Sequence, residues 1–97
     1  NGLVVNVSDQ EIMDAQKLLG RTCGVFGEPA GVTGTAGVKK LCEQGVIGKN
    51  DTVVSVVTGN GLKDVANAIK ACGEPISIPN DMELLLKAFA ERNIVVE

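Results

Sequence analysis

The 97 residues can form at most one domain, and an apolar content of 44% favours a folded chain over a disordered one. A net charge of −3 and only two aromatic residues argue against nucleic-acid binding. No apolar stretch approaches the ~20 residues of a membrane span, and no signal peptide is visible, so we expect a cytoplasmic protein. Histidine and Cys-x-x-Cys are absent, so we expect no metal site and predict buried free thiols at Cys23, Cys42 and Cys72.

The first half of the chain alternates between strand and helix signals. Leu3–Val7 is predicted as a short strand. Ser8 and Glu11 form a capping box that opens a helix over Asp9–Gly20, with one apolar face. Gly24–Phe26 is a brief second strand candidate, and a second helix is predicted over Ala30–Gln44.

The second half continues the alternation. The β-branched run Thr52–Val57 predicts a buried strand, and Val65–Ala71 predicts a helix. After extended residues 76–79, Asn80 is expected to cap a last helix, and Ile94–Val96 is a terminal strand candidate. The pattern predicts one α/β segment over residues 1–97, a parallel sheet with crossover helices in which Leu3–Val7 and Thr52–Val57 are parallel strands.

Gly31, Gly34 and Gly37 recur every third residue of the second predicted helix. This spacing leaves a face of small residues, where another backbone or a ligand can approach closely.

Two polar tracts follow strand candidates. Glu28-Pro29-Ala30-Gly31 follows the second candidate, and Thr58-Gly59-Asn60-Gly61 follows Thr52–Val57. Ligands of open α/β sheets gather at the carboxyl ends of strands, so the two tracts are predicted to converge on one ligand site. The alternative is that glycine and proline only form the turns between strands and helices and bind no ligand. The dinucleotide and P-loop motifs are incomplete.

Four motifs in order carry a family resemblance. They are Val7-Ser8-Asp9-x-Glu11-Ile12, Val25-Phe26-x-Glu28-Pro29-Ala30-Gly31, Asp51-Thr52-Val53-Val54 and Thr58-Gly59-Asn60-Gly61-Leu62-Lys63-Asp64. Together they resemble the C-terminal part of threonine synthases, pyridoxal-phosphate enzymes of the tryptophan synthase β type. The resemblance covers residues 3–70, and the last run is the most specific. Val65 stands where the family often has proline.

The resemblance implies cofactor-binding roles for four residues. The hydroxyl of Thr58 would meet the pyridine nitrogen of pyridoxal 5'-phosphate, which suits elimination and replacement chemistry. Glu28 would lie near the same side of the ring, although it could instead only complement a helix dipole. Gly59 and Asn60 would shape the wall beside the ring. Lys63 and Asp64 are expected to form a surface or inter-segment pair.

The resemblance also shows what the sequence lacks. No lysine has the context of the Schiff-base lysine, and the glycine-rich phosphate loop is absent, so no catalytic residue is expected here. The expectation is an inactive C-terminal fragment of an enzyme that converts O-phosphohomoserine and water to threonine and phosphate. Its partners would be the remainder of the polypeptide and, at full length, a second copy in a homodimer. The alternatives are a free-standing module that binds a small ligand, or a related deaminase or tryptophan synthase β-like enzyme.

Overall fold

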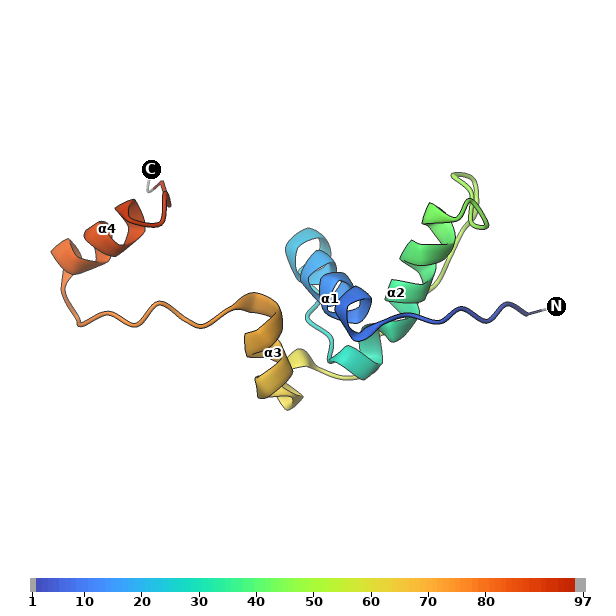
Figure 1. The fold of residues 1–97 in the computed structure, drawn as a ribbon, viewed down its shortest axis with the longest axis horizontal. Helices are drawn as coiled ribbons and strands as arrows, with labels where there is room; N and C mark the ends of the chain where they lie inside the picture. Colours follow the sequence, from blue (N-terminus) through green and yellow to red (C-terminus); the bar gives the residue numbers. More distant parts are fainter. Residues whose placement is uncertain (1, 96–97) are drawn as a thin grey trace.

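The computed structural model describes residues 2–95 as an elongated chain with extents of 59 × 28 × 19 Å. Its helices are α1 (Asp9–Cys23), α2 (Pro29–Glu43), α3 (Val65–Cys72) and α4 (Met82–Ala90), with one 3₁₀ turn, η1 (Gly61–Lys63). α1 packs against α2 and, more lightly, against α3. α4 stands apart at the end of an extended linker (Figure 1). The packed part of the chain is therefore α1, α2 and α3.

Helix α1 begins at the predicted capping box. The Ser8 backbone N–H donates to Glu11 Oε2 at 2.6 Å, and the Glu11 N–H donates to Ser8 Oγ at 3.2 Å. The predicted end near Gly20 was too early, because the helix continues to Cys23. Gly24 then adopts a φ of 67°. Glycine takes this left-handed conformation without steric cost, and it ends the helix.

The other helices follow their predicted ranges closely. α2 has Pro29 in its first turn, where the missing N–H costs nothing. The Asp64 carboxylate accepts from the Asn67 N–H at 3.2 Å and starts α3. The prediction that Asn80 caps the last helix was wrong, because Asp81 accepts from the Leu84 N–H at 3.0 Å. Local capping chemistry thus sets most of the helix ends.

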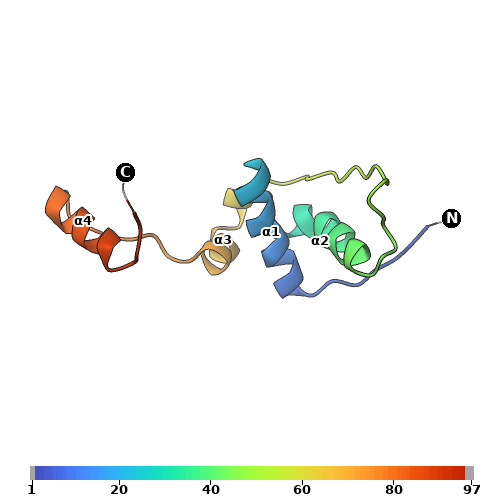
Figure 2. The same ribbon diagram turned by 90° about the horizontal axis from the view of Figure 1, so that it is seen from above.

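The predicted strands do not form a sheet within residues 2–95. Leu3–Val7 and Thr52–Val57 are extended but unpaired, and they run along different flanks of α2 (Figure 2). Lys40 Nζ donates to the Asn6 carbonyl at 2.9 Å, and the hydroxyls of Thr35 and Ser55 lie 2.9 Å apart. Without adjacent strands, neither segment can complete a backbone ladder. The parallel sheet therefore stays a prediction.

The shorter strand candidates also differ from expectation. Gly24–Phe26 is not a strand, and the neighbouring Gly27 forms one isolated antiparallel bridge with Asn60. Ile94 and Val95 are irregular, and Val96 lies outside the described residues. A single bridge still fixes how the two connections around Gly27 and Asn60 meet.

The buried core of the described chain is small and mostly alanine. Its apolar members are Ala15, Val32, Ala36, Ala68, Ala71 and Ala88. The prediction of buried thiols was wrong, since Cys23, Cys42 and Cys72 are free but exposed.

None of the described helices has the length and apolar character needed to cross a membrane. Large apolar side chains are instead left at the surface, among them Val4 at 97% and Val54 at 85% exposure.

Candidate functional site

The two polar tracts meet, as the sequence predicted. The Glu28 N–H donates to the Gly59 carbonyl at 2.8 Å, and the Gly61 N–H donates to the Phe26 carbonyl at 2.8 Å. These two bonds flank the antiparallel bridge between Gly27 and Asn60. We call this unit, residues 26–28 with 59–61, the clasp. It joins the start of α2 to residues 58–60, which lead into η1 and which we call the Thr58 turn. It sets Glu28 beside this turn.

Glycine is required where α2 meets this turn. A Cβ on Gly31 would lie 2.9 Å from the Gly59 nitrogen and 3.3 Å from Thr58 Oγ1. A Cβ on Gly59 would overlap the Glu28 carboxylate. The first contact confirms that the predicted small-residue face of α2 permits a close backbone approach. The Gly31 backbone therefore lies close to Thr58, and the Glu28 carboxylate lies close to Gly59.

The four predicted cofactor-binding residues occupy this small region with different exposure. Thr58 and Asn60 are exposed, whereas Gly59 and Glu28 are half-buried. The Asn60 side-chain oxygen accepts from the Leu62 N–H at 2.9 Å and caps η1, so its amide nitrogen is the part left for another partner. Thr58 is thus an exposed residue whose Oγ1 lies on the side of Gly31.

The charged residues around the turn have separate partners. Lys63 Nζ lies 3.5 Å from Glu28 Oε2, so Lys63 forms an inter-segment pair, with Glu28 rather than with Asp64. Asp64 binds Asn67 instead, whose side-chain N–H donates at 2.7 Å. The Asn67 side chain, followed by its backbone N–H, lowers the pKa of Asp64 below its ordinary value. Glu28 is the carboxylate that faces the Thr58 turn.

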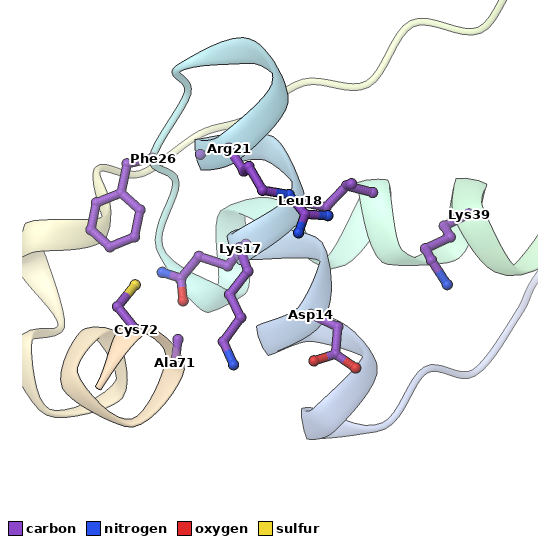
Figure 3. Close-up of a pocket in the computed structure, with 10 residues that line it drawn as sticks. Asp14, Lys17, Leu18, Arg21, Phe26, Lys39, Ala71 and Cys72 are labelled. Carbon is purple, nitrogen blue, oxygen red and sulfur yellow. The ribbon is translucent and has the colours of Figure 1, made fainter. Parts of the chain in front are cut away.

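A hollow lies beside α1, lined in part by Gln16 and by Phe26 of the clasp. It has a volume of about 730 Å³ and lies between α1 and α3, with Cys72 on α3, Phe26 on the connection between α1 and α2, and Lys39 on α2 (Figure 3). Lys17, Arg21 and Asp14 line it from α1. Glu28, Thr58, Gly59 and Asn60 do not line it. Thr58 and its neighbours Gly59 and Asn60 are therefore separate from this hollow, although Phe26 of the clasp lines it.

Sequence reasoning missed one residue that belongs to this arrangement. Gln16 on α1 is fully buried, and its Nε2 donates to the Gly27 carbonyl at 2.7 Å. The signal was present, because position 16 lies four residues after Ile12 and three before Leu19, within the apolar stripe of the helix. A polar side chain in such a stripe indicates a specific buried hydrogen bond.

Comparison with known proteins decides the family. Residues 1–59, more than half of the chain, match the family described as pyridoxal-phosphate dependent enzyme. The chain belongs to this family. It is 47% identical over 90 residues to a threonine synthase of Methanocaldococcus jannaschii, and the match covers 93% of the chain and 22% of that protein. A threonine synthase of Bacillus sp. is 49% identical over 84 residues, which are 86% of the chain and 24% of that relative.

A third relative gives the same picture. A threonine synthase of Methanosarcina acetivorans is 40% identical over 88 residues, which are 91% of the chain and 22% of that protein. The resemblance to threonine synthases is therefore confirmed. The chain spans only about a fifth to a quarter of the length of these relatives.

The residues present fit one edge of the family's cofactor. A pyridine nitrogen can accept a hydrogen bond from a hydroxyl such as that of Thr58, which is an exposed residue. Gly31 and Gly59, whose Cβ atoms would crowd this turn, leave the backbone free of methyl groups on that side. The sequence of the chain supplies neither a glycine-rich phosphate loop nor a lysine in the Schiff-base context. The fit is to the ring edge alone.

Proposed function

We propose that this chain is part of a threonine synthase and that the whole protein converts O-phosphohomoserine and water to L-threonine and phosphate. The observation that carries the proposal is the 47% identity over 93% of the chain to a threonine synthase. The clasp supports it, because it brings together the two tracts on which the resemblance depends. The proposed whole protein is a cytoplasmic homodimer that contains the remainder of the polypeptide.

In this proposal, Thr58 donates a hydrogen bond from its hydroxyl to the ring nitrogen of pyridoxal 5'-phosphate. Bound cofactor supplies an electron-withdrawing ring that stabilises negative charge developing on the substrate. Because a hydroxyl, unlike a carboxylate, does not hold a ring nitrogen protonated, Thr58 moderates that withdrawal. This suits elimination and replacement at the substrate side chain.

The other three residues shape the surroundings of Thr58. Glu28 orients the hydroxyl or a water beside it, and its position is supported by the backbone bond to Gly59 and the 3.5 Å pair with Lys63. Gly59 leaves space for the Glu28 carboxylate. Asn60 forms part of the wall with its amide nitrogen, because its oxygen caps η1. Glu28 and Asn60 thus act on the ligand through position more than through charge.

We further propose that Leu3–Val7 and Thr52–Val57 are parallel strands in the whole protein. Both segments are extended in the described chain, and they expose apolar side chains such as Val4 and Val54. Strands supplied by the remaining polypeptide would pair with their backbones and cover these side chains. The carboxyl end of Thr52–Val57 would then present Thr58 to the ligand crevice.

Thr58→Val tests the proposal, because it keeps the shape of the side chain and removes the hydroxyl. Loss of one hydrogen bond in a partly desolvated site costs about 1–3 kcal/mol, which corresponds to a roughly 5- to 150-fold lower catalytic rate. The assay is phosphate release from O-phosphohomoserine by the full-length protein, with cofactor occupancy followed by absorbance. Thr58→Ser is the matched control and should retain most activity.

Glu28→Gln should lower the rate less than Thr58→Val, since the amide keeps the shape and one acceptor oxygen. Equal rates for wild type and Thr58→Val, at equal cofactor occupancy, would reject the assignment of Thr58 to the ring nitrogen. Absence of phosphate release from the wild-type protein would reject the threonine synthase proposal itself.

A further inference from the structure

Gln16 is the one polar side chain in the buried core of the described residues. Its exposed fraction is 0%, and with Val32 it is among the largest fully buried side chains. It lies on α1, far along the sequence from the turn that carries Thr58. Buried amides are retained where their hydrogen bonds are needed, because burying an unpaired polar group is costly.

The hydrogen bond of Gln16 reaches the centre of the clasp. Its Nε2 donates to the Gly27 carbonyl at 2.7 Å, and Gly27 is the residue bridged to Asn60. The residues on either side of Gly27 make the two backbone bonds to Gly59 and Gly61. Gln16 is therefore the side chain that ties the clasp to the helix behind it.

The surroundings of Gly27 leave little room for another arrangement. A Cβ on Gly27 would lie 2.5 Å from Val57 Cγ1 and 2.7 Å from Val32 Cγ1. The backbone is thus pressed between α2 and the segment that leads to Thr58. The Gly27 carbonyl accepts its hydrogen bond from the Gln16 amide. Without this amide, the carbonyl would be buried and unpaired.

We infer that Gln16 is a positioning residue for the ligand-facing turn. It holds the Gly27 carbonyl and, through the clasp, fixes where Glu28 and Thr58 stand. The inference rests on the proposed function, because it takes the Thr58 turn as the ligand-binding surface. Gln16 itself does not touch the ligand and acts only through the backbone of residues 26–28 and 59–61.

The orientation of the Gln16 amide follows from its partner. Only Nε2 can donate to a carbonyl, so Oε1 points the other way and has no hydrogen-bond partner among the described residues. Gln16→Met therefore removes the donor and the unpaired oxygen together at similar volume. This variant should loosen the clasp.

Hydrogen–deuterium exchange of the full-length protein, followed on peptides covering residues 24–29 and 57–62, measures the clasp directly. Gln16→Met should speed exchange of the Glu28 and Gly61 amides by roughly 5- to 150-fold, because the Gly27 carbonyl loses its partner. The Ala68 amide, which donates to the Asp64 carbonyl within the next helix, should exchange as in wild type.

Gln10→Met is the matched control. Gln10 lies on the same helix, is exposed, and donates only to Asp14 at 2.9 Å, so its loss should leave the clasp unchanged. Unchanged exchange at Glu28 and Gly61 in Gln16→Met would overturn the inference. Equal acceleration at Ala68 would also overturn it, because the role of Gln16 would then be general stability.

A measurement on the wild-type protein covers the case in which the variants do not fold. With ¹⁵N-glutamine labelling, the side-chain amide protons of Gln16 should exchange more slowly than those of the exposed Gln10 and Gln44, and equal rates would contradict the inference.

The proposed function can fail separately. If Thr58→Val leaves phosphate release unchanged while Gln16→Met loosens the clasp, the proposed role of Thr58 is rejected and the role of Gln16 in holding the clasp is supported. The reverse result rejects the role of Gln16 alone.

Discussion

Replacing Gly31 by alanine should destabilise the protein, although alanine is the better helix former. The new methyl group would lie 2.9 Å from the Gly59 nitrogen and 3.2 Å from the Thr58 nitrogen. Both are backbone atoms in or next to the clasp, so they cannot turn aside as the end of a side chain can. Overpacking of this kind costs about 1–3 kcal/mol, whereas glycine to alanine within a helix contributes at most about 1 kcal/mol of stabilisation.

Gly34→Ala is the matched control in the same helix. Its methyl group would meet only Ser55 Oγ, at 3.6 Å, which is ordinary van der Waals contact. No packing cost then offsets the higher helix propensity of alanine, and Gly34→Ala should stabilise the protein by about 0.5–1 kcal/mol. Both variants gain the same helix propensity. The difference between their free energies of unfolding should therefore equal the packing cost at Gly31, about 1–3 kcal/mol.

Urea unfolding of the two full-length variants and wild type, followed by circular dichroism, measures the order of stability. The midpoint should be highest for Gly34→Ala and lowest for Gly31→Ala. Gly31→Ala should also reduce phosphate release, because the backbone of Thr58 must shift to admit the methyl group. A midpoint for Gly31→Ala equal to or above that of Gly34→Ala would refute the close approach between α2 and the Thr58 turn.

Two further predictions concern acid stability and the isolated chain. The Ser8 backbone N–H and then Lys40 lower the pKa of Glu11 from its usual 4.5 to about 2, so its contribution to stability is complete above about pH 4.5 and lost as the pH falls toward about 2. Glu11→Gln should flatten the pH dependence of the unfolding midpoint across that range, and an unchanged dependence would contradict this. The isolated chain should not form a borohydride-reducible adduct with pyridoxal phosphate at one specific lysine, as mass spectrometry of a reduced digest can check; such an adduct, with turnover of O-phosphohomoserine, would show that the catalytic lysine lies within the chain.

The helices could be predicted because their signals are local. Ser8 and Glu11 lie within one turn of each other, and the Asp64 cap lies next to the helix that it starts. Strand pairing could not be tested in the same way, because a strand needs a neighbour that its own sequence does not specify. The exposed Val4 and Val54 show that these segments have no such neighbour within residues 2–95.

The candidate site was predictable in part. The backbone bonds of the clasp confirm that the Glu28 and Thr58 tracts come together, whereas the ligand site at which they were predicted to converge stays a prediction. The antiparallel bridge was not predicted, because the crossing of two connections beyond their strands leaves no periodic signal. Gln16 was missed since its importance depends on a contact with Gly27, eleven residues away.

The central claim is that Thr58 meets the ring nitrogen of pyridoxal phosphate in the whole protein. The most direct measurement is the ¹⁵N chemical shift of that nitrogen, with labelled cofactor bound to full-length wild type, Thr58→Ser and Thr58→Val. We predict nearly the same shift for wild type and Thr58→Ser and a clearly different one for Thr58→Val, because only the valine lacks the hydroxyl. The same shift in all three proteins would contradict the claim.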